Sequence, residues 1–342
     1  MKISFPAEWY PQSGVQLTWP HKDTDWADYL EEVIACYVSI AKEILRFQKL
    51  IIVCKNKEEV LLQIKDKLPI SNISFYEMDT NDTWARDHTP ISVFIDGVPT
   101  IYDFTFNAWG LKFAADKDNL ISRNLYLQGA FNSNVKYMPY LEYVLEGGAI
   151  ESDGCGTLLT TEKCLLSNNR NEFLSKEEQE ELYKKIFGLE RILWLKHGFL
   201  KGDDTDSHVD TLARFCAEDT IAYVQCVDKE DEHYEELYKM EQELKSFKTK
   251  KGEPYCLIPL PLPPAIYDDL GNRLPATYAN FLIINKAVLL PIYACEEDKL
   301  AAEQLKKAFP DRELVCVNCL PLIKQHGSLH CVSMQYPQGF LQ

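Results

Sequence analysis

Apolar residues recur at three- and four-residue steps in several segments, and a short apolar run follows each of these segments. The clearest segment spans residues 27–47. Its apolar positions are Leu30, Val33, Ile34, Tyr37, Ile40, Ala41, Ile44 and Leu45. This spacing places one apolar stripe along a helix. The run at residues 50–54 follows directly and predicts a buried strand.

The same order of helix and strand recurs four more times. In one of these units Ser175 and Glu178 have the spacing of a capping box, and Gly188 is placed to end the helix. The predicted helix and strand pairs are residues 58–68 with 73–76, 175–187 with 192–195, 231–247 with 255–258, and 296–309 with 314–317.

Two hairpins without an intervening helix complete the pattern. They join residues 90–95 to 98–106 across Asp96-Gly97, and residues 281–284 to 287–292 across Asn285-Lys286. No Ser/Gly-rich linker and no abrupt shift in composition divides the chain. We therefore predict a single α/β domain over residues 1–342, built from repeated strand-pair, helix and strand units.

Composition limits the partners. Hydrophobic residues make up 46% of the 342 residues, which is enough for a sizeable core. The 36 Lys and Arg residues face 52 Asp and Glu residues, and the formal net charge is -16. Phosphates would be repelled, so neither nucleic acid nor an anionic membrane is expected as the main partner. A cationic small molecule would be attracted.

The sequence favours the cytoplasm. The first residues lack the apolar run of a signal peptide, and no segment approaches the roughly 18 apolar residues that span a bilayer. The 11 cysteines are an odd number, which fits reduced thiols better than a disulfide framework. The oligomeric state stays open, a homo-oligomer included.

Four polar segments lie between apolar strands, where binding residues tend to lie. They are residues 81–87 (NDTWARD), 145–148 (LEGG), 203–210 (DDTDSHVD) and 326–331 (HGSLHC). Each has a structural explanation by itself: a Trp beside an Asp is usually a packing residue, and Glu-Gly-Gly is usually a turn. On a strand, His208 and Asp210 would share one face, and such pairs are commonly structural.

Zinc binding is one alternative. Cys316 and Cys319 have two residues between them, His326 and His330 have three, and Cys331 is adjacent. However, only six residues separate the two pairs, whereas finger-like sites need about twelve or more. Cys316 also lies in an apolar strand pattern, where a buried cysteine acts as a small hydrophobe.

Taken together, the four segments suit chemistry on a guanidinium group. This flat, forked cation pairs with carboxylates, and Asp87 and Asp210 could each bind one edge of it while Trp84 stacks on its face. Its resonance-stabilised carbon needs a strong nucleophile, and the thiolate of Cys331 is the best candidate. His208 could protonate the leaving ammonia and later deprotonate water.

These residues resemble those of the guanidine-modifying enzymes, and within them the branch of agmatine deiminases and bacterial peptidyl-arginine deiminases. The matching motifs extend over nearly the whole chain. They are Pro6-Ala7-Glu8-Trp9, Thr18-Trp19-Pro20-His21, Trp84-Ala85-Arg86-Asp87, residues 104–110 (FTFNAWG), Leu145-Glu146-Gly147-Gly148, His208-Val209-Asp210, residues 274–281 (LPATYANF) and His330-Cys331.

The resemblance implies a five-bladed pseudo-symmetric α/β propeller, the pentein fold, with the active site in a central channel and neither metal nor cofactor. It makes Cys331 the nucleophile and His208 the general acid and base. Asp87 and Asp210 become the guanidinium clamp, and Trp84 and Glu146 shape the pocket. Two further substrate-binding candidates are Asp206, which could instead stabilise its loop, and Asn280, for which the same alternative holds.

The substrate follows from a missing arginine. Relatives that act on arginine or peptidyl arginine supply an Arg for the carboxylate or backbone, and the corresponding segment, FNAWGLKF, contains none. We therefore expect hydrolysis of agmatine to N-carbamoylputrescine and ammonia, in putrescine biosynthesis. Lys112 could replace that Arg, so conversion of peptidyl arginine to citrulline is the alternative. Agmatine deiminases usually have a glycine where this chain has Ser207, and a glycine-rich stretch where it has His326-Gly327-Ser328.

Overall fold

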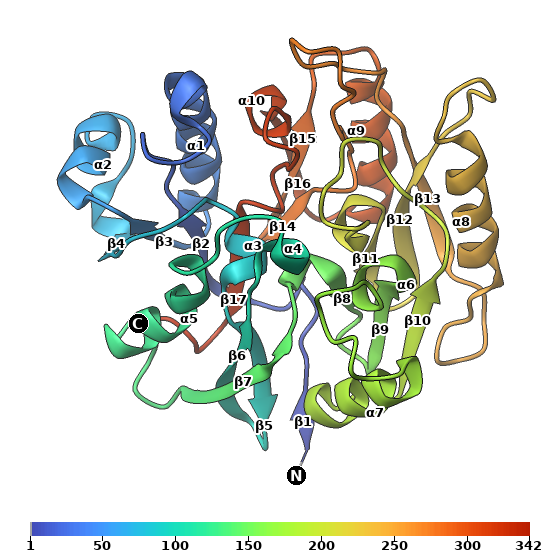
Figure 1. The fold of residues 1–342 in the computed structure, drawn as a ribbon, viewed down its shortest axis with the longest axis horizontal. Helices are drawn as coiled ribbons and strands as arrows, with labels where there is room; N and C mark the ends of the chain where they lie inside the picture. The colour runs from blue at the N-terminus through green and yellow to red at the C-terminus, as the bar shows by residue number, and fades with distance from the viewer. Residues whose placement is uncertain (1) are drawn as a thin grey trace.

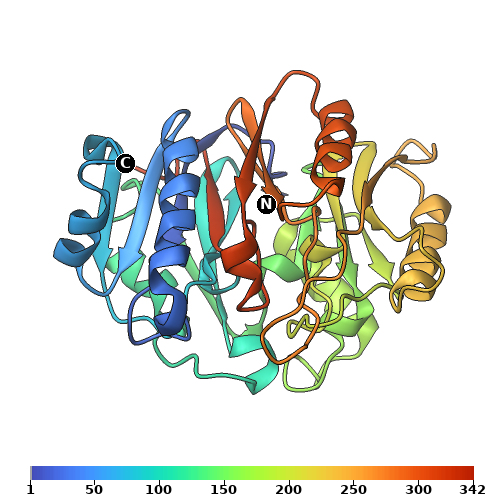
Figure 2. The same ribbon diagram turned by 90° about the horizontal axis from the view of Figure 1, so that it is seen from above.

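The strands of the computed structural model, which describes residues 2–342, form five separate sheets (Figure 1). Figures 1 and 2 show the long helices on the outside of the molecule and the sheets nearer its centre. The strand orders are β1-β5-β6-β7, β10-β9-β8, β11-β12-β13, β14-β15-β16 and β17-β2-β3-β4.

All five sheets contain the same unit of three strands. An antiparallel pair comes first, and a third strand then pairs in parallel with the second. A parallel strand needs a crossover connection, and in each unit that connection contains at least one helix. The predicted order of helix and strand is therefore confirmed.

The strands of the first two sheets in chain order are β1 (Ile3–Ser4), β5 (Ile91–Ile95), β6 (Val98–Thr105) and β7 (Lys136–Val144), then β8 (Ile150–Ser152), β9 (Thr157–Thr161) and β10 (Arg191–Leu195). Those of the next two are β11 (Ala213–Ala217), β12 (Thr220–Gln225) and β13 (Cys256–Pro261), then β14 (Leu282–Ile284), β15 (Ala287–Ile292) and β16 (Glu313–Asn318). The last sheet holds β17 (Ser333–Pro337), β2 (Gln12–Thr18), β3 (Lys49–Cys54) and β4 (Ile73–Glu77).

The α-helices are α1 (Leu30–Leu45), α2 (Lys57–Ile64), α3 (Ala85–His88), α4 (Ala108–Leu111), α5 (Ile121–Leu127), α6 (Glu162–Leu165), α7 (Lys176–Phe187), α8 (Tyr234–Ser246), α9 (Glu297–Ala308) and α10 (Leu320–Ile323). The 3-10 turns are η1 (Ala27–Tyr29), η2 (Ile70–Asn72), η3 (Asp118–Leu120), η4 (Gly147–Ala149) and η5 (Val209–Thr211). None of the helices in residues 2–342 is both long and apolar enough to cross a membrane.

Local signals produced the predicted ends and turns. The Ser175 hydroxyl accepts a hydrogen bond from the Glu178 N–H, and the Glu178 carboxylate accepts one from Ser175, so the capping box is confirmed. Gly188 ends α7 in the left-handed conformation. The turn between β5 and β6 has positive φ at Asp96 and Gly97, as a two-residue hairpin requires.

The two ends of the chain share one sheet. Strand β17 pairs antiparallel with β2, with Ser333 opposite Leu17. The last strand thus supplies the antiparallel partner that the N-terminal β2-α1-β3 segment needs to complete its unit.

The first strand of every unit is preceded by a short irregular segment, and these segments meet near the middle of the molecule. Helix α3 precedes β5, η4 precedes β8 and η5 precedes β11, and η4 packs against both α3 and η5. Residues 277–280 precede β14, and residues 328–331 precede β17. Equivalent positions of five units therefore bring distant residues together. The interpretation of His208-Val209-Asp210 as a strand is wrong, because Val209 and Asp210 begin η5.

Candidate active site

A cavity of about 150 Å³ lies where these segments meet. Of the predicted site residues, Trp84, Asp87 and Cys331 line it. His208, Asp210, Glu146, Asp206 and Asn280 do not. The remaining lining residues are Asp25, Asp82, Trp109, Phe113, Asp203, Asp204, Thr205, Thr211, Gln325, His326 and Gly327.

Cys331 is held between two neighbouring units. Its backbone N–H donates to Asn280 Oδ1 at 3.2 Å, and its carbonyl accepts from the Arg86 N–H at 3.0 Å. Its Sγ lies 3.3 Å from Asn280 Oδ1. Burial, together with the carboxylates of Asp210 and Asp87, raises the pKa of the Cys331 thiol well above its usual range. Without a cation in the cavity the sulfur therefore stays protonated.

Asp87 is fixed by two donors. The Gly148 N–H donates to its Oδ1 at 2.9 Å, and the Trp109 indole N–H donates to its Oδ2 at 3.0 Å. Burial and the nearby carboxylate of Glu146 nevertheless raise the pKa of Asp87 to about 7. The Asp87 carboxyl is therefore poised between its two charge states near neutral pH.

Gly148 is the point at which three functional side chains converge. A Cβ at this position would lie 2.5 Å from His208 Nδ1, 2.9 Å from Asp87 Oδ1 and 3.0 Å from Asp210 Oδ2. The Glu-Gly-Gly segment thus allows a close approach that a side chain would prevent.

His208 is buried and has unused hydrogen-bonding capacity. Its Nδ1 lies 3.6 Å from Asp87 Oδ1, and neither ring nitrogen has a hydrogen-bond partner among residues 2–342. Burial and the cations of Arg170 and Lys112 lower the pKa of His208 well below its usual range. The imidazole is neutral and able to take up a proton when a nearby charge changes.

Asp210 is oriented from behind. His330 Nδ1 lies 2.7 Å from its Oδ2, whereas its Oδ1 is buried and has no partner in the described chain. Burial and the neighbouring carboxylate of Asp87 raise the pKa of Asp210 well above its usual range. Two carboxyl groups therefore share one buried site.

Glu146 and Asp206 belong to an ion-pair network outside the cavity. Arg170 Nε donates to both oxygens of Glu146, at 3.0 and 3.1 Å, and Arg170 Nη1 donates to Asp206 at 2.6 Å. Lys112 also binds Asp206, at 2.8 Å. Glu146 lies beside His208 and Cys164, with their polar atoms within 4.8 Å of one another. Both carboxylates are thus already paired with cations.

Trp84 forms one wall of the cavity. Its indole N–H donates to Asp82 Oδ2 at 2.9 Å, and its ring lies edge-on to that of Trp109. A Cβ at Gly327 would overlap the Trp84 ring. His326 has a φ of 67°, and its Nδ1 donates to the Gly202 carbonyl at 2.8 Å. The loop before Cys331 therefore packs closely against the indole.

The cavity is acidic. Five aspartates line it, and its lining, as far as the structure describes it, contains no Lys or Arg. Burial raises the pKa of Asp204 to about 6. Lys112 Nζ is bound by the Asp204 carbonyl and by the Asp206 carboxylate, so it does not reach the cavity as a free cation.

The residues of the zinc alternative are not gathered. Cys316 is exposed on β16, so the expectation that it is buried is wrong. Within residues 2–342, only two groups of three potential ligands are close enough to share an ion: Glu146, Cys164 and His208, and Glu8, Glu151 and His330. Arg170 binds Glu146, and Arg214 binds both Glu8 and Glu151. Neither group contains Cys316, Cys319 or His326.

The family model of the Porphyromonas-type peptidyl-arginine deiminases matches residues 4–337. The chain belongs to this family. An agmatine deiminase from Stutzerimonas stutzeri is 31% identical over 363 aligned positions, which cover 98% of this chain and 96% of that protein. The resemblance found in the sequence is thereby confirmed.

Solved structures of similar proteins carry different names. One from Porphyromonas gingivalis, provisionally named an arginine deiminase, is 53% identical, with a TM-score of 0.95 and full coverage of both chains. A cysteine-to-serine variant of C. jejuni agmatine deiminase with substrate bound is 40% identical, with a TM-score of 0.91 and coverage of 99% and 97%. At 11% identity and a TM-score of 0.52, a dimethylarginine dimethylaminohydrolase covers 95% of this chain and shares the fold alone.

Several residues around this cavity could not be singled out from the sequence. Trp109 and Lys112 lie in the segment FNAWGLKF, whose pattern indicates only that an Arg is absent, and none of the motifs contains Arg170. A pattern search has no signal for Arg170, because its partners lie 24 and 36 residues away in the chain. The glycine pair at residues 147–148 carried a signal that was interpreted as a turn.

Proposed function

We propose that this chain is an agmatine deiminase, a cysteine-dependent hydrolase that converts agmatine and water to N-carbamoylputrescine and ammonia. The observation that carries the proposal is the charge of the cavity. Agmatine has two cationic ends and no carboxylate. Five aspartates line the cavity, and its lining within residues 2–342 contains no Lys or Arg. Such a cavity suits agmatine better than it suits arginine, which carries a carboxylate.

Lys112 supports the same choice. The alternative substrates, arginine and peptidyl arginine, need a donor for a carboxylate or a backbone carbonyl. Lys112 is the nearby cation that could supply it, but the Asp204 carbonyl and the Asp206 carboxylate already bind its ammonium group. Recruiting Lys112 to a substrate would break both contacts.

In the first half-reaction, the guanidinium of agmatine binds between Asp87 and Asp210, with Trp84 against its face. The arriving positive charge lowers the pKa of the Cys331 thiol, and the thiol gives its proton to the neutral imidazole of His208. Sγ attacks the central guanidinium carbon. The bond to one terminal nitrogen breaks, and His208 supplies the proton with which ammonia leaves.

In the second half-reaction, water replaces ammonia beside the covalent amidino intermediate. His208, which is then neutral, accepts a proton from that water. The oxygen attacks the same carbon, the C–S bond breaks, and His208 returns its proton to Sγ, which restores the thiol of Cys331. The carbon keeps its oxidation state throughout, so the cycle requires no redox cofactor.

The remaining candidates act around this centre. Glu146, neutralised by Arg170, supports the ring of His208 rather than contacting substrate. Asn280 positions Cys331 through its Oδ1, and Asp206 restrains Lys112 and Arg170. The five equivalent sheets support a five-bladed propeller that forms one catalytic domain over residues 1–342, with this cavity in its central channel.

The test is ammonia release from agmatine, free arginine and a blocked arginine peptide, measured side by side. We expect the highest kcat/KM for agmatine. Lys112→Met should leave arginine turnover low, because the lysine does not anchor a carboxylate. Faster release from the arginine peptide than from agmatine would reject the assignment and favour a protein-arginine deiminase.

A further inference from the structure

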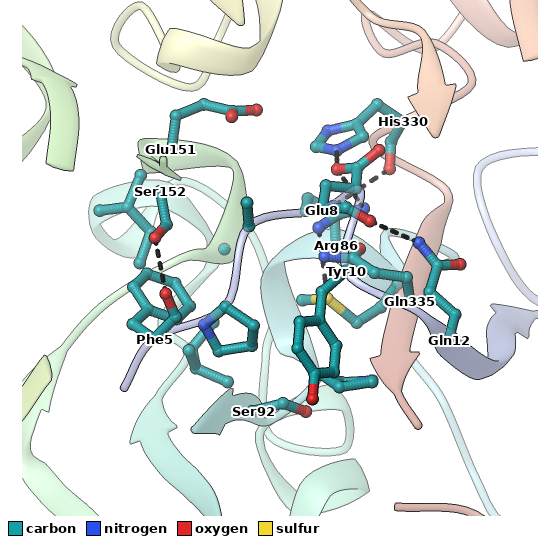
Figure 3. A pocket seen from close by; sticks show the side chains of 17 residues that line it. Phe5, Glu8, Tyr10, Gln12, Arg86, Ser92, Glu151, Ser152, His330 and Gln335 are labelled. Carbon is teal, nitrogen blue, oxygen red and sulfur yellow. Dashed lines mark hydrogen bonds and ion pairs between the residues drawn. The ribbon is translucent and has the colours of Figure 1, made fainter. Parts of the chain in front are cut away.

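His330 lies between two buried carboxylates on the side of the site that faces away from the agmatine cavity. Its Nδ1 is 2.7 Å from Asp210 Oδ2, and its Nε2 is 2.7 Å from Glu8 Oε2. The side chain is 2% exposed and lies at the wall of a second cavity, of about 50 Å³. Figure 3 shows the His330 ring above Glu8 and Arg86.

These two contacts set a proton count. A carboxylate oxygen can only accept a hydrogen bond, and a neutral imidazole carries a single N–H. Two contacts of 2.7 Å therefore require two protons among Glu8, His330 and Asp210. Either the imidazole is doubly protonated between two carboxylates, or it is neutral and one of the acids holds the second proton. The two states differ only in the position of one proton along a short hydrogen bond.

The charged surroundings assign that proton to the Asp210 end. Glu8 also accepts from Arg214 Nη2 at 2.7 Å and from the Ile283 N–H at 2.6 Å. Burial by itself would raise the pKa of Glu8, but Arg214 and His330 hold this pKa well below its usual range, so Glu8 stays ionised.

Asp210, in contrast, faces a second acid. Burial and Asp87 raise its pKa well above the usual range, and burial with the cations of Arg214 and Arg86 lowers that of His330. The other charged or titratable groups that face this trio include Glu151, His208, Asp203 and Cys331. Before substrate binds, the second proton therefore lies on Asp210.

We propose that His330 is a positioning residue that stores this proton during substrate binding. When the guanidinium arrives, the O–H bond of Asp210 breaks and an N–H bond forms at Nδ1 of His330. Glu8 balances the resulting imidazolium. Asp210 becomes the carboxylate that binds the cation, and no proton has to leave the buried site. The inference rests on the proposed function, because it takes the guanidinium to bind at Asp210.

The alternative would couple affinity to pH. If the proton had no acceptor inside the protein, every binding event would release it to solvent. At pH values below the pKa of Asp210, affinity would then rise about tenfold for each unit by which the pH increases. A stored proton removes that coupling.

The experiment measures proton release on agmatine binding by isothermal titration calorimetry in buffers of different ionisation enthalpy. Cys331→Ala provides the non-reacting parent. His330→Gln and Glu8→Gln are added to it, with His233→Gln as the matched control. His233 is likewise buried and contacts a carboxylate at 2.7 Å, but it lies outside the site. Because Asp87 titrates equally in all variants, the difference from the parent is the informative quantity.

We expect His330→Gln to release about one proton more than the parent and to make the slope of log Kd against pH about one unit more negative. Glu8→Gln should release an intermediate number, since the imidazolium loses its counter-charge, and this variant tests the idea even if His330→Gln does not fold. His233→Gln should match the parent. Equal proton counts in the parent and in the folded variants at residues 8 and 330 would overturn the inference. Failure of the parent to bind agmatine would instead overturn the proposed function on which it rests.

Discussion

Replacing Gly148 by Ala adds one methyl group where three functional side chains meet. The new Cβ would lie 2.5 Å from His208 Nδ1, whereas ordinary non-bonded contact begins at about 3.4 Å, so the imidazole must retreat by about 0.9 Å. The carboxylates of Asp87 and Asp210 must retreat by about 0.4 to 0.5 Å. A displacement of about 1 Å can cost about 100-fold in rate, because reacting groups lose their alignment.

We therefore expect Gly148→Ala to lower kcat/KM for ammonia release from agmatine by about 100-fold. Overpacking of this kind costs about 1–3 kcal/mol of stability. Gly252→Ala is a matched control: its φ is +82°, so the alanine is strained by about 1–2 kcal/mol, but no atom lies within 4 Å of its Cβ. The control should lose comparable stability in urea and keep full activity.

The geometric reasoning is wrong if Gly148→Ala keeps kcat/KM within threefold of the parent. It is also wrong if Gly252→Ala loses as much activity as Gly148→Ala, because the loss would then follow stability rather than contact with the three side chains.

Three further predictions follow from the same site. Cys331→Ala should abolish ammonia release while calorimetry still detects agmatine binding; residual turnover would remove the cysteine from the reaction. The pKa of Asp87 is raised to about 7, so the ionised form that binds a cation accumulates as the pH rises, and kcat/KM should increase up to about pH 7 and then level. Asp87→Asn should lower activity and remove this increase. A pH profile that is unchanged in the variant would contradict the role of Asp87. Arg170→Gln leaves the buried Glu146 carboxylate without a partner, which should lower the free energy of unfolding in urea by about 3–5 kcal/mol. Arg46→Gln removes one side of an exposed ion pair and should leave the urea midpoint almost unchanged. Equal midpoints for the two variants would show that the buried pair contributes little.

Several elements could be predicted because their causes are local. The capping box of α7 joins residues three positions apart, and the turn between β5 and β6 depends on two residues. Helix α1 begins at Leu30 rather than at residue 27, because a 3-10 turn precedes it. The predicted helix at residues 231–247 likewise begins only at Tyr234. Such end positions depend on tertiary contacts more than on periodicity.

The site divides in the same way. Motifs indicated Trp84, Asp87 and Cys331, and all three line one cavity. Motifs also indicated Glu146 and Asp206, but the structure pairs both with Arg170. Residue type and spacing show that an acid is present. They do not show which cation already neutralises it.

The sequence by itself determined the repeated units and the family, and it indicated candidate reactive side chains, because periodicity, turn chemistry and motifs are properties of short segments. Only the tertiary structure decided which side chains share a surface. His330 and Glu8 are 322 positions apart in the chain. They meet because the segment between β1 and β2, which contains Glu8, lies beside the segment before β17, which contains His330. The protonation of such a cluster depends on burial and on the distances between its charges, and both arise only when the five sheets are assembled.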